Sequence, residues 1–273
     1  MKLISLKTGL IKPKDDLINT LFLTFKRQNV KLKDGDVLTI SSKVVALTEG
    51  RRINLKHVNA SKKAKSLNKL KYSKDSNDYS ALAELILQES DFIFNEGNTC
   101  LTIKDGIFIP SAGIDLSNSG DGHAILWPKD LQKSANQLWQ KICRYFNLKK
   151  FGIIITDSHC QPLRSGISGI ALSFKGFEGI EDCRNQEDLF KRKLKITRKA
   201  VADNLACAAA VLMGESNEGI PAVLIRGAPV KFTNRKIFQK EAFFPPDDDL
   251  FAGIYSRKFK KKVGEYWKVI NNK

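Results

Sequence analysis

Apolar side chains recur at intervals of three and four residues in four stretches, and this spacing predicts four helices. The stretches are residues 16–26, 80–90, 129–146 and 199–216. The side chains expected to face inward include Leu82, Leu85 and Ile86 in the second helix and Leu138, Ile142 and Tyr145 in the third. Ser80 is a candidate N-cap of the second helix, and Gly214 is expected to end the fourth, which is rich in alanine and predicted to be buried.

Runs of branched apolar residues predict strands between these helices. They lie at the beginning of LISLKTGLIKPKDD, in VLTISSKVVAL, in both halves of CLTIKDGIFIP, in IIIT and in PAVLIRGAPV. The IIIT run (153–156) is expected to end there, so that Asp157, Ser158 and His159 would form a polar turn. Strands and helices follow one another without a regular βαβ rhythm. The predicted fold class is therefore α+β, with mixed sheets and helices, and not a doubly wound sheet.

The composition is that of a globular chain that buries a core. Of 273 residues, 42% are apolar, which suits one large domain or two small ones. No apolar run approaches the roughly 18 to 20 residues that a membrane span needs, and the first residues lack the apolar segment of a secretory signal. The five cysteines form no CxxC pair, which indicates reduced thiols and a cytoplasmic location.

The formal net charge of +17 is the most unusual bulk property. A surplus of this size attracts polyanions such as RNA, nucleotides and polyphosphates. The lysines are spread widely, however, with their densest runs at 61–74 and 257–268, and a lysine-rich surface also serves solubility alone. Charge by itself leaves a polyanion partner and a solvated surface both open.

Three acidic residues stand where regular structure is expected to end. Asp115 follows a glycine-containing turn in PSAGIDLSN, Asp157 follows IIIT, and Glu215 follows the stop of the alanine-rich helix in MGESNEG. Carboxylate oxygens in such places suit Mg²⁺ or Mn²⁺, but acids also cap helices and close turns everywhere. The usual nucleotide signatures, such as GxxxxGK[ST] and GxGxxG, are absent from the sequence.

Four stretches together resemble the coenzyme F420-0 γ-glutamyl ligases and their bacterial relatives. They are DGDVLTISSKVVALTEGR, PSAGIDLSN, IIITDSHCQPLRSGISGIAL and VADNLACAAAVLMGESNEGIPAVLIRG, and the likeness covers about residues 3–230. The resemblance implies an α+β fold that forms intertwined dimers, and a reaction in which GTP and a divalent metal join L-glutamate to a carboxylate. It also implies a catalytic domain over residues 1–240 and a basic, aromatic extension over 241–273.

The resemblance carries roles to individual positions. Metal ligands are expected at Asp115, Asp157, Ser158 and Glu215. Nucleotide contacts are expected at Gly9, Ser41, Ser42, Asn118, Met213, Gly214, Ser216 and Gly219. Apart from the resemblance, basic residues at strand ends or turns can assist the transfer, and the candidates are Lys43, Arg164 and Arg226; each of these three is equally a candidate for a solvated surface charge.

The chain departs from the family pattern in places. Ala46 and Leu47 stand where the family commonly has a Ser-Lys pair whose lysine contacts the nucleotide, so GTP and ATP both stay open. Asn185 and Lys191 replace glycines of a glycine-rich stretch. MGESNE and the TDS…PLR.G pattern look more like the bacterial relatives, for which a folate-like acceptor is as plausible as coenzyme F420-0.

Two functions of different classes follow. The first is a γ-glutamyl ligase that uses Mg²⁺ or Mn²⁺ with GTP or ATP, works as a homodimer on small-molecule substrates, and needs neither membrane nor nucleic acid. The second is a non-catalytic, basic nucleotide- or RNA-binding protein on a ligase-like scaffold. The three acids favour the first, because a pure phosphate binder gains little from clustered carboxylates. The aromatic residues of the tail are read as packing residues; they are Tyr255, Phe259, Tyr266 and Trp267.

Overall fold

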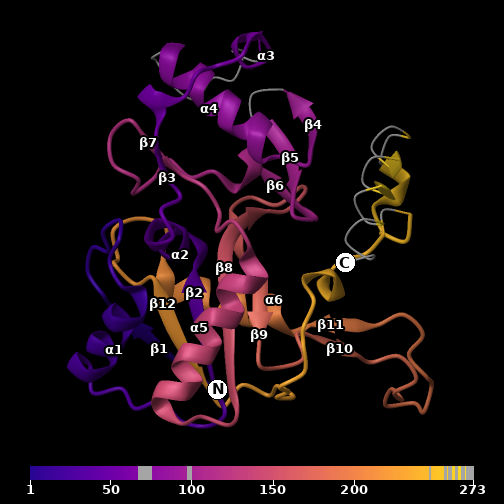
Figure 1. The fold of residues 1–273 in the computed structure, drawn as a ribbon. Helices are drawn as coiled ribbons and strands as arrows, with labels where there is room; N and C mark the ends of the chain where they lie inside the picture. The colour runs from indigo at the N-terminus through magenta and orange to yellow at the C-terminus, as the bar shows by residue number, and fades with distance from the viewer. Residues whose placement is uncertain are drawn as a thin grey trace. The chain divides into compact units, whose positions relative to one another are not determined.

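The computed structural model describes residues 1–66, 76–96, 100–245 and 247–254, and beyond them only 257, 260, 261, 264, 265 and 268 (Figure 1). The four aromatic residues of the tail lie outside these. The chain divides into two compact units. The first comprises Met1–Glu49 and Pro128–Ala242, and the second comprises Gly50–Trp127 and Phe243–Lys273.

A five-stranded sheet forms the centre of the first unit. Its order is β1-β12-β2-β8-β9. The strands are β1 (Lys2–Leu6), β12 (Ala222–Arg226), β2 (Asp36–Ser41), β8 (Phe151–Cys160) and β9 (Ile167–Lys175). Strands β2 and β8 run parallel, and the other neighbouring pairs run antiparallel. The mixed sheet with its helices confirms the predicted α+β class.

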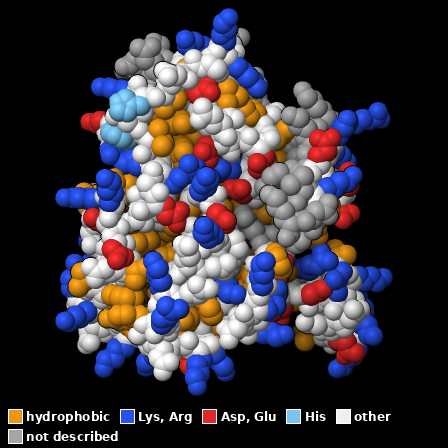
Figure 2. All heavy atoms as spheres, in the orientation of Figure 1, with side chains coloured by type: hydrophobic (Ala, Val, Ile, Leu, Met, Phe, Trp, Pro, Cys, Tyr) orange, Lys and Arg blue, Asp and Glu red, His pale blue; other side chains and the backbone are white. Residues whose placement is uncertain are grey.

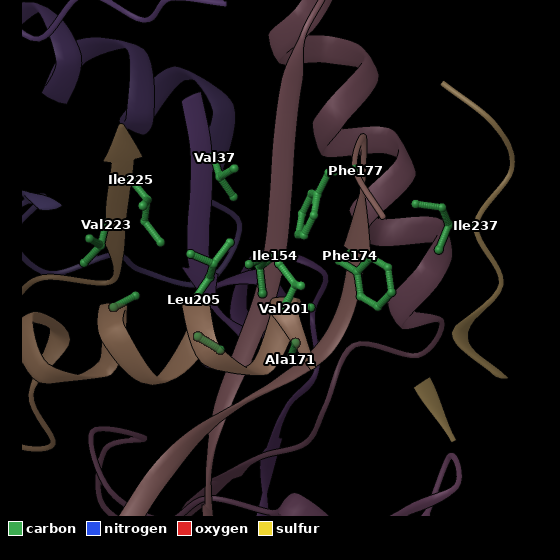
Figure 3. Close-up of a cluster of buried hydrophobic side chains, with 13 residues drawn as sticks. Val37, Ile154, Ala171, Phe174, Phe177, Val201, Leu205, Val223, Ile225 and Ile237 are labelled. Carbon is green, nitrogen blue, oxygen red and sulfur yellow. The ribbon is translucent and has the colours of Figure 1, made fainter. Parts of the chain in front are cut away.

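Helix α6 (Val201–Met213) covers one face of this sheet, and the main buried cluster lies between them (Figure 3). Val37, Ile154 and Val223 point from three adjacent strands toward Leu205 of the helix (Figure 3). Alternation along a strand sends Ile153 to the opposite face, and it too is fully buried. The sheet is therefore apolar on both faces over its central strands.

Three further helices belong to the first unit, namely α1 (Leu17–Arg27), α2 (Ser42–Thr48) and α5 (Leu131–Phe146). Helix α5 packs against β8 and β9, while α1 contacts β1, α2 and α5. Asp16 caps α1 by accepting N–H bonds from Ile18 and Asn19 at 2.9 and 3.1 Å. Asp130 caps α5 by accepting the N–H of Lys133 at 2.8 Å. The chain of this unit ends in a short 3₁₀ turn at Gln239–Ala242.

A long ribbon extends from the first unit between β9 and α6. Its strands are β10 (Ile180–Asp182) and β11 (Arg198–Ala200), and it is drawn at the lower right of Figure 1. Three large apolar side chains on the connecting loop are exposed: Leu189 by 99%, Phe190 by 78% and Ile196 by 87%. Asp188 on the same loop forms a local ion pair, in which Arg192 Nε contacts Asp188 Oδ2 at 3.0 Å.

Among the residues that the structure describes, the second unit has a three-stranded sheet, a two-stranded ribbon and the helices α3 and α4. The sheet is β4 (Phe92–Glu96), β5 (Cys100–Lys104) and β6 (Ile107–Pro110), and the ribbon pairs β3 (Arg52–Asn54) with β7 (His123–Ile125). The helices are α3 (Lys62–Ser66) and α4 (Ser76–Glu89), with 3₁₀ turns at Leu55–His57, Ser111–Gly113 and Ala252–Ile254. Leu82, Leu85 and Ile86 of α4 are buried, as predicted.

Several sequence predictions are wrong in instructive ways. VLTISSKVVAL is one strand followed by helix α2, because β2 ends at Ser41 and the following apolar residues fold into a helical turn that buries Val45 and Ala46. Ser80 is not an N-cap, since α4 already begins at Ser76. Tyr145 is 66% exposed and stacks on Phe22, with ring centroids 4.0 Å apart.

Helix α6 is only partly buried, contrary to the prediction from its composition. Its inner side, including Ala206 and Ala209, is fully buried, but Val211 on the outer side is 82% exposed. The small side chains allow close approach to β9 and do not mark burial on every side. None of the helices that the structure describes is long and apolar enough to cross a membrane.

Candidate functional site

The strand that carries Asp157 and Ser158 continues past the expected turn. Strand β8 extends to Cys160, and Asp157 through Cys160 pair with residues 170–167 of β9. The prediction of a turn at Asp157–His159 is therefore wrong. The reason is that β9 supplies a pairing partner for a polar segment that would not form a strand on its own pattern. The two strands turn at residues 161–166.

A β-bulge separates the apolar half of this hairpin from its polar half. The register shifts between Ile155 and Thr156, where Ile155 pairs with Ser173 and Thr156 with Ala171, so Leu172 is an extra residue on β9. Bulges bend a strand and re-aim the side chains beyond them. Asp157 and Ser158 are the next residues along β8, and they pair with the part of β9 that lies beyond this irregularity.

Glu215 lies beside Ser158. The Ser158 hydroxyl donates to Glu215 Oε1 at 2.7 Å, and this contact joins the end of β8 to the loop that follows α6. Asp157 accepts the N–H of Ser158 through Oδ1 at 2.8 Å. Three of the four predicted metal ligands therefore come from two adjacent segments, 157–158 and 215. A helix C-terminus carries a partial negative charge, and Glu215 follows that of α6 by two residues.

Glu218 shapes the loop that presents Glu215, although no pattern in the sequence indicates this role. The N–H of Ser216 donates to Glu218 Oε2 at 2.9 Å. Hydrogen bonds from backbone N–H groups of Glu218 itself, Ser216 and Glu215 hold the pKa of this carboxyl below its usual value. Gly214 has φ +68°, and a Cβ there would meet the Glu218 carboxylate at 2.2 Å. The glycine is thus favoured by its conformation, and a side chain there would displace the Glu218 carboxylate.

Two more predicted segments meet the loop that follows Glu215. The N–H of Thr8 donates to Gly219 O at 3.2 Å, so the loop that contains Gly9 runs beside Gly219. The N–H of Ser41 donates to Pro221 O at 2.9 Å, which places the end of β2 beside the start of β12. Ser42 and Lys43 follow directly as the first turn of α2; Ser42 is buried and Lys43 half-exposed.

All of these segments lie at one end of the five-stranded sheet. Ser41 is the register partner of Thr156, and Ile40 is the partner of Ala222. The ends of β1 and β2, the start of β12 and the middle of β8 are thus neighbours. They bring together two sets of predicted site residues of this unit. The predicted nucleotide contacts are Gly9, Ser41, Ser42, Met213, Gly214, Ser216 and Gly219. The predicted metal ligands are Asp157, Ser158 and Glu215.

The three basic candidates have different surroundings. Lys43 is in α2 at the edge just described. Arg164 lies in the exposed tip of the β8–β9 hairpin, where its N–H donates to Gln161 O at 3.3 Å. Arg226 lies at the other end of β12, and its guanidinium binds both oxygens of Asp36 at 2.9 and 2.8 Å. This two-point contact makes Arg226 a structural partner of a buried acid, away from the edge that carries Ser41.

Asp115 and Asn118 belong to the second unit. The backbone of Asp115 exchanges two hydrogen bonds with Ile125, each of 2.9 Å, and its Oδ1 accepts both the N–H and the hydroxyl of Ser117 at 2.7 Å. Asn118 has φ +53°. Arg52 of β3 holds this loop, because its Nε donates to Ser119 O at 2.7 Å. A short polar turn therefore displays Asp115 in a defined conformation.

The backbone just before Asp115 is strained. Ser111, Ala112 and Gly113 have φ of +51°, +55° and +67°, and each non-glycine residue in this region costs about 1–2 kcal/mol. The N–H of Ala112 donates to the buried Thr102 Oγ1 at 2.9 Å. A Cβ on Gly113 would lie 2.2 Å from the Trp127 ring. Strain of this kind is retained where the surroundings enforce it, often at functional sites.

The donor set at the Ser158–Glu215 contact fits a hard divalent cation, because carboxylate and hydroxyl oxygens are the ligands that Mg²⁺ and Mn²⁺ prefer. No group of three or more His, Cys, Asp and Glu side chains able to hold a metal was found in the described part of the chain. A bound cation here would therefore complete its shell with water and substrate oxygens, as Mg²⁺ commonly does.

The comparison with known families decides the class of the protein. The model of the F420-0:γ-glutamyl ligase family matches residues 5–227, which is most of the chain. The chain belongs to this family. As a family member it is a ligase that forms amide-type bonds. The match includes both the sheet edge of the first unit and the Asp115 loop of the second.

Several archaeal relatives carry the name coenzyme F420:L-glutamate ligase. That of Methanococcus maripaludis strain S2 is 37% identical over 92% of this chain and 97% of its own length. Those of Methanopyrus kandleri and Methanocaldococcus jannaschii are 35% and 36% identical, over 80% and 81% of this chain and 82% and 86% of their own. These relatives are archaeal, whereas the sequence patterns had suggested a likeness to bacterial members of the family.

One departure from the family pattern has a structural counterpart. Leu47, which replaces the family lysine, is 8% exposed in α2 beside the fully buried Ala46. The position contributes to the core of the first unit in this chain. Lys43, one helical turn earlier and half-exposed, is the basic residue that α2 offers at the same edge of the sheet.

Proposed function

We propose that the protein joins L-glutamate to a carboxylate acceptor, through its α-amine, in a reaction driven by GTP or ATP and dependent on Mg²⁺ or Mn²⁺. Family membership supports the ligase chemistry. The observation that carries the rest is the convergence of the Gly9 loop, Ser41, Ser158 and Glu215 at one end of the sheet. These segments are distant in sequence, and an edge built from glycine turns, hydroxyls and carboxylates suits a metal–nucleotide complex.

The chemistry requires activation of the acceptor. Its carboxylate attacks the γ-phosphorus of the nucleotide, the bond to the nucleoside diphosphate breaks, and an acyl phosphate forms. The glutamate amine then attacks the acyl carbon, loses a proton, and expels inorganic phosphate. A divalent cation, when bound, would neutralise phosphate charge during the transfer. Asp157, Ser158 and Glu215 are the residues that would hold it, and Asp115 stays a predicted ligand by resemblance.

The remaining residues of the edge bind and orient. The glycine turns at Gly9 and Gly219 leave backbone accessible, and Ser41, Ser42 and Ser216 offer hydroxyls. Lys43 supplies positive charge on α2, and Arg164 supplies it on the hairpin tip, where it can neutralise the phosphoryl group or the acceptor. Positioning of this kind provides most of the rate enhancement in phosphoryl transfer. Asn118 stays a predicted nucleotide contact.

The acceptor that the relatives' names favour is coenzyme F420-0. A folate-like acceptor is the alternative, because both classes present a terminal carboxylate next to a flat heterocycle. The relatives cited are all named for the F420 reaction, and that supports the deazaflavin over the folate. The proposal assigns coenzyme F420 biosynthesis to this protein on the same ground.

We further propose a cytoplasmic homodimer. All five cysteines are free thiols, as expected for a reducing compartment. The ribbon between β9 and α6 supports self-association, because it exposes Leu189, Phe190 and Ile196 almost completely. Burial of these side chains against a second copy would stabilise the pair. Sedimentation of the purified protein tests this part, and a monomer at micromolar concentration contradicts it.

The enzymatic proposal is tested with purified protein, Mn²⁺, L-glutamate, GTP or ATP, and either coenzyme F420-0 or a folate. Phosphate should be released with one acceptor and nucleotide, and the product should gain the mass of one glutamyl residue. Release of phosphate with neither acceptor would defeat the assignment. A reaction with folate alone would retain the ligase and replace its substrate.

RNA binding measured across salt concentrations, together with the turnover assay, distinguishes the ligase from the alternative of a non-catalytic nucleotide- or RNA-binding protein. Lysine and arginine side chains are scattered over the face shown in Figure 2, with acidic side chains between them. A binder of RNA would show strong affinity that falls steeply with salt and no metal-linked turnover. We expect weak, diffuse RNA binding together with metal-linked turnover.

A further inference from the structure

Helix α6 is fastened to strand β9 by two polar contacts that lie one helical turn apart. Asp203 Oδ1 accepts the N–H of Ala171 at 2.9 Å, and the Cys207 thiol donates to Gly169 O at 3.0 Å. Gly169 makes this approach possible, because a Cβ there would lie 2.6 Å from the carbonyl oxygen of Ala206. The helix backbone and the strand backbone are therefore in direct contact.

The Asp203 contact falls at the bulge. Ala171 is the residue of β9 that pairs with Thr156 immediately after the register shift, next to the extra residue Leu172. A bulge disrupts the ladder of hydrogen bonds locally, and Asp203 supplies an acceptor from outside the sheet for an N–H at that place. The carboxylate thereby fixes where the register changes.

The bulge changes the register of β9 against β8. Because the extra residue is Leu172 of β9, it is the side chains of β9 that change faces beyond it, while β8 keeps its own alternation of faces. Ser158 pairs with Gly169 and bonds Glu215, while Asp157 pairs with Ile170. The contacts of α6 with Ala171 and Gly169 therefore hold the part of β9 that pairs with Asp157 and Ser158 against the helix that leads into Glu215.

Burial at this position has a cost. Asp203 lies in the first turn of α6, where desolvation raises its pKa, opposed by the Ala171 N–H and by nearby His159. A neutral polar residue of the same shape would satisfy the N–H as well. The hydrogen bond to the Ala171 N–H therefore depends on the length and direction of the Asp203 side chain and on its acceptor oxygen, and not on its charge.

We propose that Asp203 is a positioning residue of the metal site, which holds β9 against α6 at the bulge and thereby keeps the end of β8 that carries Asp157 and Ser158 beside Glu215. It does not touch metal or substrate in this account. The inference rests on the proposed function, since the site it positions is the proposed one. It also explains why α6, which leads into Glu215, and β8, which carries Ser158, are linked through β9.

Two substitutions of Asp203 separate position from charge. Asp203→Asn keeps the length and the acceptor oxygen and removes the charge, whereas Asp203→Glu keeps the charge and displaces the oxygen by one methylene. Asp130→Glu is the matched control, because Asp130 also accepts one backbone N–H at a helix start, at 2.8 Å from Lys133, and is no part of the proposed site. The affinity for Mn²⁺ alone is measured by electron paramagnetic resonance, with hydrogen exchange at Ala171.

Asp203→Glu should weaken Mn²⁺ binding by about 10- to 100-fold, the range seen when supporting groups around metal ligands are lost, and should speed exchange at Ala171. Asp203→Asn and Asp130→Glu should bind within about threefold of wild type. The inference is overturned if Asp203→Glu binds like wild type, or if Asp203→Asn is the weaker of the pair, since charge would then matter more than position. If the wild type itself binds no Mn²⁺, the proposed function fails and the inference fails with it.

Discussion

The acidic side chains at the two ends of the central sheet have different kinds of partner. At the end where β12 finishes, Arg226 binds both oxygens of Asp36, which is only 1% exposed. Asp34 nearby accepts the N–H groups of Lys149 and Lys150 at 2.7 and 2.9 Å. At the other end Glu215 accepts a hydroxyl from Ser158, and the neighbouring strand adds Asp157. One end matches acids with cations and backbone donors; the other collects oxygen ligands.

This difference distinguishes structural charge from functional charge. A buried acid that is matched by a guanidinium contributes to the fold and attracts nothing further. Carboxylates gathered at a strand end and after a helix C-terminus attract a cation. Arg226 and Asp157 both looked like site residues because each stood at the end of a strand. Only the strand directions and the register show that they belong to different ends of the sheet.

The largest expected effect is at the ligand-rich end. Asp157→Asn or Glu215→Gln should lower kcat/KM by on the order of 10²-fold or more, equivalent to roughly 2.7 kcal/mol of transition-state stabilisation. The free energy of unfolding should not fall, because the substitutions remove acidic charge from an exposed or half-exposed cluster. Steady-state kinetics and urea denaturation of each variant check this. Loss of stability with unchanged kcat/KM would show that Asp157 and Glu215 serve the fold and not the reaction, which contradicts the comparison of the two ends.

At the end of the sheet where Arg226 binds Asp36, substitutions should lower stability and leave catalysis nearly unchanged. Arg226→Ala leaves the buried Asp36 without its guanidinium and should cost about 3 kcal/mol of unfolding free energy. Its kcat should stay near the wild-type value at a temperature where the variant is folded. Replacing both partners by leucine should recover much of the stability, since an apolar pair avoids the buried charge. A stable Arg226→Ala variant with low kcat would return Arg226 to the functional site.

A smaller effect is expected from two glycines of the Glu215 loop. Gly214→Ala and Gly219→Ala both place a side chain at positive φ, +68° and +65°, which costs about 1–2 kcal/mol. The new Cβ clashes with Glu218 only at Gly214; at Gly219 nothing lies within 4 Å. Gly214→Ala should therefore weaken Mn²⁺ binding as well, measured by titration, while Gly219→Ala should not. Equal Mn²⁺ affinities would show that Glu218 does not shape the site.

The smallest effect is a dependence of stability on pH at the matched end. Two backbone N–H groups, of Lys150 and Lys149, hold the pKa of Asp34 below its ordinary value of 3.8. Because the folded pKa is the lower one, this stabilisation is present above about pH 3.8 and is lost as pH falls through the folded pKa. Asp34→Asn should thus be less stable than wild type at neutral pH and approach it in acid. A stability difference that stays constant from pH 7 to pH 3 would contradict this.

The sequence predicts much of the fold because many of its elements are locally consistent. A helix follows Asp16 as predicted, and Gly214 ends α6 at the predicted residue. The mistakes arise where tertiary pairing decides. The polar residues 157–160 form a strand only because β9 pairs with them, and VLTIS changes to helix at Ser42 because β2 ends at the sheet edge.

The candidate site is predicted by resemblance more than by pattern. No local signal in the sequence indicates that Thr8 meets Gly219 or that Ser158 meets Glu215, since these contacts join segments far apart in the chain. Supporting residues such as Asp203, Glu218 and Arg52 were missed for the same reason. Each acts through hydrogen bonds to the backbone whose partners are fixed by the fold, and a lone acid or arginine in a sequence does not reveal them.

The central claim is that the oxygen-bearing side chains at the end of β8 and after α6 hold a divalent cation for a nucleotide. The direct measurement is anomalous scattering from crystals soaked in Mn²⁺ and GTP. We expect an Mn²⁺ peak in contact with the carboxylates of Asp157 and Glu215, and loss of that peak in Glu215→Gln. Nucleotide bound without Mn²⁺ at these residues, or an Mn²⁺ peak that survives the substitution unchanged, would contradict it.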